Sequence, residues 1–406
     1  MESRDLYVRI WRDLAKEKSM IFLAGPRQSG KTTLAQIISR SFSNNLYFNW
    51  DIAQHRTRLI ENPTFFEAVE RKDSSTPLIV FDEIHKYKEW KNYLKGVYDQ
   101  FHDSYQFLVS GSGRLDIYQK GGDSLAGRYY LFHLWPFTVA ELGKHNVVIE
   151  ELLKDPLKIS MEKQEELKEI WSLLSTLSGF PEPYLSGRMT TYRRWTNTYS
   201  QQLIREDIRD LTEIKSVGDM ELLYLLLPSK VGNPLSIPSL ARDLRLSYNT
   251  VRSWLSVFER FFLVFTITPW TQKIARAIQK ERKIYLFDAP RIEEPSARFE
   301  NLVALELWRA VTSWNNTGYG LFSLHFIKNK EQQEVDFMIT KERKPFLLIE
   351  AKLSDTQPSI ALKKFQRALS IPAVQLVNEG NGYRMLSNDN QSILVAPAYQ
   401  WLSQLP

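Results

Sequence analysis

The feature that most constrains this chain is the segment GPRQSGKT, which runs from Gly25 to Thr32. It fits the pattern G-x-x-x-x-G-K-[ST] at every position, with an apolar run over Met20–Ala24 before it and a helical pattern over Thr32–Ser41 after it. In this strand–loop–helix context the glycines let the backbone wrap phosphates, and the backbone amides and the helix dipole attract them. The pattern therefore predicts a P-loop that binds ATP with Mg²⁺.

The predicted nucleotide site has a second half in the run LIVFDE, Leu78–Glu83. Four apolar residues predict a buried strand, and ligands of open α/β sheets bind at the carboxyl ends of the strands. We expect Asp82 to hold Mg²⁺ with Thr32, and Glu83 to activate the attacking water. An acidic pair after an ordinary strand is the alternative, which the intact P-loop disfavours. The predicted ATP-binding residues are Gly25, Pro26, Arg27, Gln28, Ser29, Gly30, Lys31, Thr32 and Thr33, and Lys31 is also expected to act in catalysis.

Two further residues are candidates for the reaction itself. Ser110 follows the apolar run Phe107–Val109, so it either senses the γ-phosphate or positions water, or it is a turn residue before Gly111. Arg128 either stabilises transition-state charge, in cis or in a neighbouring subunit, or forms a structural ion pair. The sequence alone leaves both alternatives open.

The order of patterns along the chain predicts several domains. A chain of 406 residues is expected to form two to four domains at roughly 100–200 residues each. Strand and helix patterns alternate in the first third, which predicts a mostly parallel sheet with helices on both faces. We expect an ATPase core over residues 1–145, a helical lid or linker over 146–228, a winged helix-turn-helix over 229–278 and a second α/β domain over 279–406.

Composition limits the location and chemistry of the chain. It has no cysteine, which excludes disulfides and thiolate zinc sites. No run approaches the 18 or more apolar residues of a spanning helix, and the first residues lack the order of a signal peptide, so we expect a cytoplasmic protein without membrane contact. The net charge of +6 permits contact with nucleic acid without requiring it.

Four quoted segments, GPRQSGKTTL, LIVFDEIHK, FLVSGSGRL and DSLAGRYYLFHLWPFTVAEL, resemble the AAA+ ATPase domain of a large prokaryotic family related to the STAND branch of P-loop proteins. His85 stands where that family commonly has glutamine. The resemblance implies a C-terminal domain of unknown function that contains a winged helix and a restriction-endonuclease-like fold.

The winged-helix prediction rests on Ile237–Arg260, which has helix-turn-helix spacing. Tyr248, Asn249 and Arg252 lie at the start of its second helix, where a recognition helix presents polar side chains to DNA. Ordinary helix packing is the alternative. Double-stranded DNA is therefore a candidate partner.

The last region carries a pattern similar to the PD-(D/E)xK nuclease core. Asp336 lies in one predicted strand, and Glu350 and Lys352 share a face of the next because strand side chains alternate. Glu300, on the preceding helix, matches the helical acid of that core. Two half-exposed strands with outward charges are the alternative.

Two functional hypotheses follow. In the first, an ATPase acts on DNA and the C-terminal site cuts it. In the second, ATP controls contacts among domains or with a partner protein, and the winged helix and an inactive nuclease-like fold serve as interaction surfaces. A homo-oligomer or a protein partner is expected as a candidate assembly.

Overall fold

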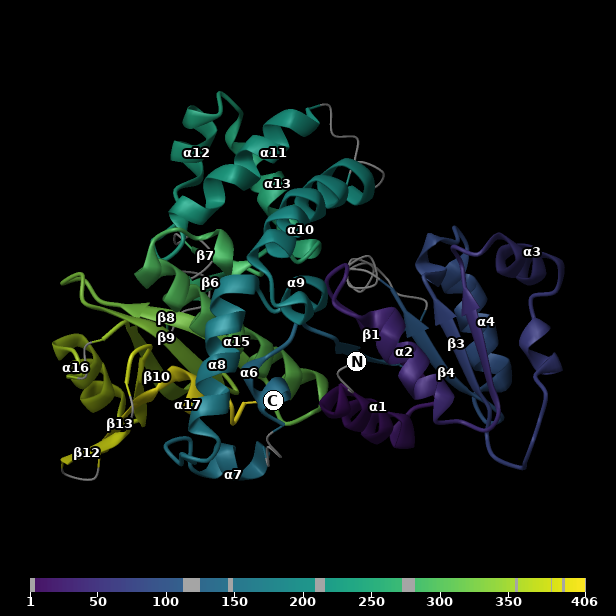
Figure 1. The fold of residues 1–406 in the computed structure, drawn as a ribbon, viewed down its shortest axis with the longest axis horizontal. Helices are drawn as coiled ribbons and strands as arrows, with labels where there is room; N and C mark the ends of the chain where they lie inside the picture. The colour runs from purple at the N-terminus through teal and green to yellow at the C-terminus, as the bar shows by residue number, and fades with distance from the viewer. Residues whose placement is uncertain are drawn as a thin grey trace. The chain divides into compact units, whose positions relative to one another are not determined.

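The computed structural model describes residues 4–111, 125–144, 149–208, 216–271, 282–354, 357–380, 382–388 and 391–405. The chain forms two compact units, Met1–Pro136 and Phe137–Pro406 (Figure 1). No helix of the described ranges is both long and apolar enough to cross a membrane. The predicted segments Phe107–Leu115 and Asp123–Leu142 lie partly outside the described residues, as does the predicted boundary at 278–279.

The N-terminal unit is a parallel sheet of order β2-β3-β4-β1-β5. Its strands are β1 Met20–Ala24, β2 Asn45–Asn49, β3 Leu78–Asp82, β4 Gln106–Ser110 and β5 Tyr130–His133. Its helices are α1 Asp5–Glu17, α2 Lys31–Arg40, α3 Ala53–Glu61 and α4 Trp90–Phe101, with short 3₁₀ turns at Phe65–Ala68 and Ile84–Lys86. The predicted parallel α/β sheet is confirmed.

Alternation along buried strands explains the three layers of this unit. In β1, Ile21 and Leu23 face a core shared with α1 and α2, while Phe22 faces a second core that includes α4. Successive strand residues point to opposite faces, so an uninterrupted apolar strand is covered by helices on both sides. The buried polar residues Asp82 and Ser110 stand at the carboxyl ends of β3 and β4.

The first half of the C-terminal unit is helical. It contains α6 Val139–Gly143, α7 Ile149–Lys154, α8 Gln164–Leu177, α9 Pro181–Ser186, α10 Met189–Gln202 with a π-helical extension Leu203–Ile208, α11 Val217–Leu226 with a 3₁₀ turn Leu227–Lys230, α12 Ile237–Asp243 and α13 Tyr248–Arg260. Serines cap the predicted helix-turn-helix: Ser236 accepts from the Ser239 amide, and Ser247 from the Thr250 amide. Figure 1 shows α11, α12 and α13 gathered together.

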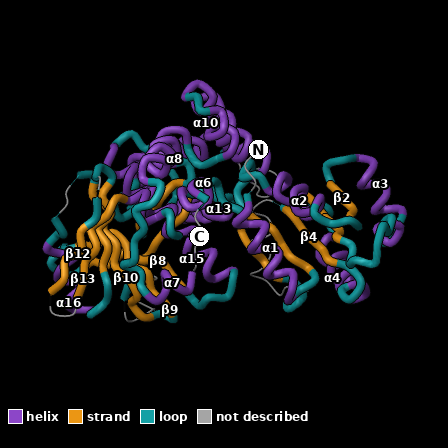
Figure 2. The backbone as a smooth tube through the Cα atoms, turned by 60° about the horizontal axis from the view of Figure 1, so that its bottom comes forward, coloured by secondary structure: helices purple, strands orange, loops and turns teal. Residues whose placement is uncertain are grey.

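The second half of this unit is an eight-stranded sheet of order β12-β13-β11-β10-β9-β8-β6-β7, whose neighbouring strands Figure 2 shows in orange. The strands are β6 Val264–Pro269, β7 Lys283–Leu286, β8 Phe322–Lys328, β9 Glu334–Lys341, β10 Lys344–Lys352, β11 Ala373–Val377, β12 Arg384–Asn388 and β13 Gln391–Pro397. The helices are α15 Pro295–Asn316, α16 Ile360–Leu369 and α17 Ala398–Leu402, with a 3₁₀ turn at Ala289–Arg291.

Strands β9 and β10 form an antiparallel hairpin, with Leu348 opposite Met338. Its tight turn is made by Glu342 and Arg343, whose φ angles of 49° and 65° are those of a type I′ turn. After the helix-turn-helix, β6 pairs antiparallel with β7.

The four-part division of the chain stays a prediction, while Phe137–Pro406 forms one compact unit. The strand pair after the helix-turn-helix joins the large sheet, since β6 also pairs with β8 through Thr268 and His325. The expected lid is tied to the end of the chain, where Trp401 donates its indole N–H to the Pro156 carbonyl at 2.9 Å and Trp171 donates to Asn378 at 2.8 Å. Residues that bury each other in this way belong to one core.

Candidate nucleotide site

The P-loop lies between β1 and α2, and its shape depends on Gly25. The φ angle there is +144°, and a Cβ at this position would lie 2.2 Å from the Leu134 carbonyl oxygen. Gly30 precedes α2 with a φ of 97°. Only glycine adopts such angles without strain, so both glycines of the motif are required by backbone geometry.

Lys31 is folded back onto the loop that precedes it. Its ammonium donates to the carbonyls of Gly25 at 3.1 Å and Pro26 at 2.6 Å, and the residue is only 6% exposed. The positive charge is therefore held inside the loop, beside the amino end of α2, where a phosphate is attracted by both.

Asp82 ends β3 fully buried, with its two carboxylate oxygens in different situations. Oδ2 accepts from the Thr32 hydroxyl at 2.8 Å, from the Tyr47 hydroxyl at 2.5 Å and from the Asn49 amide at 3.4 Å. Oδ1 is buried and has no hydrogen-bond partner among the described residues. A buried carboxylate oxygen without a partner is costly unless a ligand satisfies it.

Ser110 lies beside Asp82, because the two residues are register partners on β4 and β3. Its hydroxyl is also buried without a hydrogen-bond partner in the described ranges. The predicted Ser110 thus contributes a second unused polar group at the same edge of the sheet.

These residues fit a magnesium ion held with a nucleotide. Mg²⁺ in such sites takes one or two carboxylates, a hydroxyl and phosphate oxygens, with waters filling the rest. Asp82 and Thr32 are the side chains that would hold it, and a bound ion would neutralise phosphate charge. No cluster of three acidic or histidine residues with a metal-binding arrangement occurs in the described residues, and this type of site does not need one.

Glu83 follows with a left-handed backbone, φ 57°, which turns the chain away from the strand. Its carboxylate lies 3.1 Å from the Lys86 ammonium and 3.7 Å from His85 Nε2. Lys86 also contacts Asp51 at 2.7 Å. Burial by itself would lower the pKa of Lys86, but Asp51 and Glu83 together raise it. The predicted base is thus held by a charged lysine.

Arg128 lies away from the nucleotide site of its own chain. It precedes β5, whose Tyr130 pairs with Ile21 at the start of β1, so it lies at the amino edge of the sheet. Its guanidinium contacts Asp99 of α4 at 2.6 and 3.1 Å, which lowers the pKa of Asp99. A strand of five residues separates the two edges by roughly 15 Å. This geometry agrees with the ion-pair alternative and gives no support to a role in cis.

Three residues of this site were missed by the sequence analysis. Tyr47 and Asn49 alternate on β2 and reach Asp82 because β2 is the neighbour of β3. Period-two spacing on the adjacent strand could have indicated them once the strand order was known. Arg4 is 5% exposed and donates to the Ser29 carbonyl at 2.9 Å and the Trp135 carbonyl at 2.7 Å, and no local pattern points to it.

The predicted C-terminal residues converge on the hairpin and α15. Asp336 accepts from the Ala351 amide at 2.9 Å, and Lys352 lies 3.2 Å from Glu350, as expected for two residues on one face of β10. Burial raises the pKa of Glu300 to about 7, with Asp336 adding to the shift and Lys283 opposing it. Burial likewise raises the pKa values of Asp336 and Glu350.

Lys283, which the sequence analysis did not single out, lies among these acids. Its side chain is 1% exposed, and its ammonium is 3.1 Å from Glu300 and 2.6 Å from Glu334. The Tyr285 hydroxyl also donates to Glu300 at 2.8 Å. The acid cluster therefore already contains a cation from its own chain. Lys283 is the last of four consecutive charged residues before the apolar run Ile284–Phe287, so no local pattern distinguished it.

The predicted DNA-binding residues of α13 lie on the surface. Tyr248 is 47% exposed, and Asn249 and Arg252 are exposed on the same helix. Val251 and Phe258 are buried, so α13 has one packed face and one open face.

Comparison with known proteins divides the chain in three. Residues 17–143 match the family model of an AAA domain, and residues 168–289 and 296–399 match two domains of unknown function, DUF8612 and DUF4143. An uncharacterized protein of Methanocaldococcus jannaschii is 23% identical over 93% of this chain and 86% of its own length. An uncharacterized protein of Mycobacterium tuberculosis is 22% identical over 99% of this chain and 85% of its own length.

Two solved structures show weaker similarity. The Walker-type ATPase of Pyrococcus abyssi covers 72% of this chain and 95% of its own, with 15% identity and a TM-score of 0.43. The match to the Aeropyrum pernix Orc1 protein in complex with DNA covers 75% of this chain and 93% of the Orc1 chain, with 13% identity and a TM-score of 0.35. The family match and the P-loop geometry together identify residues 17–143 as a nucleotide-binding domain of the AAA ATPase type.

Proposed function

We propose that the N-terminal unit hydrolyses ATP with Mg²⁺. The observation that carries the proposal is the state of the Asp82 carboxylate. Its Oδ2 accepts a hydrogen bond from the Thr32 hydroxyl, and its Oδ1 is buried without a partner in the described part of the chain. Lys31 supplies charge to the phosphates, Ser110 a hydroxyl beside Asp82, and Glu83 a base for water.

The reaction needs Glu83 to leave or loosen its contact with Lys86. A water deprotonated by Glu83 would attack the γ-phosphorus, and the bond to the β–γ bridging oxygen would break, so that ADP leaves with that oxygen. The P-loop amides and Lys31 hold the phosphates in place. Because Lys86 is shared with Asp51, a modest movement of the turn after β3 would transfer the lysine fully to Asp51.

Steady-state ATP hydrolysis tests this assignment. Lys31→Ala is expected to lose both nucleotide binding and turnover, whereas Glu83→Gln keeps binding and loses about 100-fold or more in kcat. Lys88→Ala, an exposed lysine of the same unit, is the control. Wild-type protein that neither binds nor hydrolyses ATP would refute the proposal.

We also propose that the helix-turn-helix contacts double-stranded DNA, with Tyr248, Asn249 and Arg252 on the open face of α13 in support. DNA binding should weaken steeply with salt, and DNA should stimulate the ATPase. If no DNA or RNA binds at low salt, the alternative of a nucleotide switch that controls protein contacts takes its place.

Nuclease activity at Glu300, Asp336, Glu350 and Lys352 stays a prediction. The convergence of these residues favours it, while Lys283 between Glu300 and Glu334 favours the inactive, switch-like alternative. Magnesium-dependent cleavage of DNA that Glu350→Ala abolishes would support the nuclease. Cleavage that Glu350→Ala leaves unchanged would assign it elsewhere.

A further inference from the structure

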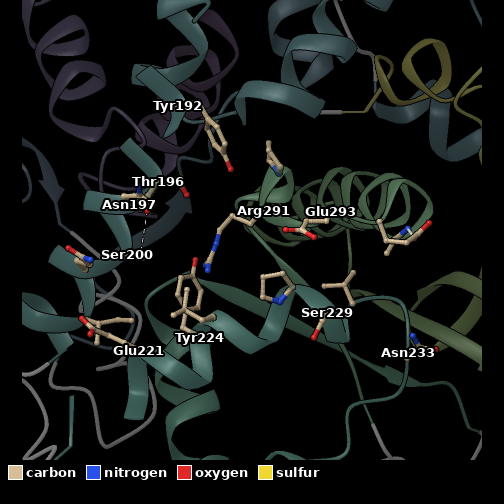
Figure 3. A pocket seen from close by; sticks show the side chains of 18 residues that line it. Tyr192, Thr196, Asn197, Ser200, Glu221, Tyr224, Ser229, Asn233, Arg291 and Glu293 are labelled. Carbon is tan, nitrogen blue, oxygen red and sulfur yellow. Dashed lines mark hydrogen bonds between the residues drawn. The ribbon is translucent and has the colours of Figure 1, made fainter. Parts of the chain in front are cut away.

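A pocket of about 880 Å³ lies within the C-terminal unit (Figure 3). Its walls come from α10 and its π-helical extension, from α11 and the 3₁₀ turn after it, and from the segment that leads into α15. This volume is in the range of small-molecule sites, which are commonly about 300–1,000 Å³.

Arg291 is the cation of this pocket. Its guanidinium lies over the Tyr224 ring, 3.9 Å from the centroid, and Figure 3 shows it extending between Tyr192 and Tyr224. The stacking fixes one face of the guanidinium. Its NH1 group is buried and has no hydrogen-bond partner among the described residues. Arginine donors suit the oxygens of carboxylates and phosphates.

The carboxylates near Arg291 are largely committed to other groups. Glu221 is held by Arg205 at 2.6 and 3.0 Å, and Glu294 caps α15 through the Ser296 and Ala297 amides. Glu293 is exposed.

Asp288 lies behind the pocket wall and is nearly fully buried. One of its oxygens accepts from the hydroxyls of Thr196 at 2.7 Å and Tyr192 at 3.3 Å. It offsets part of the Arg291 charge without forming an ion pair within 4 Å that would occupy NH1.

The rest of the lining is apolar enough to hold the body of a ligand. Ile204, Pro228 and Val231 contribute to the walls, and Ile204 and Val231 are buried. Leu225 also lines the pocket although it is 64% exposed. An exposed leucine and a partly buried arginine in the same lining suit a molecule with an apolar part and one anionic group.

We propose that this pocket binds a small organic oxyanion, a carboxylate or phosphate attached to an aromatic or aliphatic body. The oxyanion accepts from the Arg291 guanidinium, and the body lies along Ile204, Pro228, Val231 and Leu225. Such a site is separate from the proposed ATP site, so the full chain would carry two anion-binding pockets with different selectivity.

Titration calorimetry on the full chain tests the pocket with three probes. Phenyl phosphate and benzoate carry the two oxyanions on the same ring, and phenol carries none. At least one anion is expected to bind at least tenfold more tightly than phenol, and their order distinguishes phosphate from carboxylate. Binding should persist in Lys31→Ala, which separates this site from the P-loop. Loss of binding in Lys31→Ala, or equal binding of all three probes, would overturn the proposal.

Two pairs of variants locate the binding. Arg291→Gln should weaken the anion about tenfold or more, while Arg194→Gln, an exposed arginine on α10 outside the lining, should not. Because Arg291 could matter for folding, Leu225→Glu places a repelling charge at an exposed position of the lining. It should weaken the anion, while Leu222→Glu, 51% exposed on the same helix and outside the lining, should not. Unchanged binding in folded Arg291→Gln and in Leu225→Glu would refute the site.

Discussion

The two units each bury carboxylates at a sheet, but they balance the charge in different ways. In the N-terminal unit Asp82 receives neutral donors on one oxygen and leaves the other buried without a partner in the described ranges. In the C-terminal unit Lys283 lies within 3.1 Å of Glu300 and Glu334. At the first site the proposed Mg²⁺ would supply the positive charge, whereas the second site carries its own cation in Lys283. Similar residue types therefore predict ligand dependence at one site and internal stability at the other.

The largest expected effect comes from removing the internal cation. Lys283→Met should lower the free energy of unfolding by about 3–5 kcal/mol, because it leaves the partly buried Glu300, Glu334 and Asp336 without their buried positive partner. Urea unfolding measures this loss. Lys328→Met is the matched control: Lys328 contacts the same Glu334 at 3.3 Å but is 31% exposed, so we expect about 1 kcal/mol or less. Similar losses in both variants would contradict the distinction between the two sites.

Much of the nucleotide site could be predicted from the sequence because its motifs are local. Gly25, Lys31 and Thr32 lie within eight consecutive residues, and Asp82 ends an apolar strand. The parallel sheet followed from the alternation of strand and helix patterns. Tyr47 could not be assigned, since its contact with Asp82 depends on which strand lies next to β3.

In the acid cluster around Glu300, Asp336 and Glu350, local sequence patterns predict some contacts and miss others. The spacing of Glu350 and Lys352 on one strand was sufficient to predict their contact. Lys283 reaches the cluster from the far end of a mixed sheet whose order joins β7, β6 and β8. The same long-range pairing merges the predicted winged helix and C-terminal domain into one unit, which composition along the chain did not reveal.

A second test uses pH to compare the acid cluster with the surface. The pKa of Glu300 is raised by burial from 4.5 to about 7, so the folded state keeps a proton that the unfolded state releases. This contribution to stability is fully present below pH 4.5 and is lost as the pH rises through 7, a change of about 3 kcal/mol. Urea unfolding between pH 4.5 and 7.5 should show the fall in wild type and a smaller one in Glu300→Gln. Glu293→Gln, at an exposed position, should keep the wild-type profile, and an equal fall in Glu300→Gln would count against the assignment.

The P-loop offers a test of the nucleotide site, which is the ligand-dependent site of the two compared above. Gly25→Ala should weaken ATP binding about 100-fold, or about 2.7 kcal/mol, because the φ of +144° is strained for alanine and the new Cβ would lie 2.2 Å from the Leu134 carbonyl oxygen. Binding of a fluorescent nucleotide measures the loss. Gly96→Ala, in α4 with no atom within 4 Å of the added Cβ, should bind normally and match or exceed wild-type stability. Normal binding by Gly25→Ala would show that the loop adopts another shape when it holds nucleotide.

The smallest effect is expected at Tyr47, which competes for the charge of Asp82. Its hydroxyl donates to Asp82 Oδ2 at 2.5 Å, and burial together with that carboxylate raises the pKa of Tyr47, so the phenol stays protonated and continues to donate. Tyr47→Phe removes one donor and makes the carboxylate a stronger ligand. The Mg²⁺ concentration for half-maximal ATPase should therefore fall by about three- to tenfold. Tyr93→Phe, which loses a comparable bond to the Pro63 carbonyl at 2.9 Å, should leave this concentration unchanged. A higher Mg²⁺ requirement in Tyr47→Phe would instead show that Tyr47 holds Asp82 in the orientation that the ion needs.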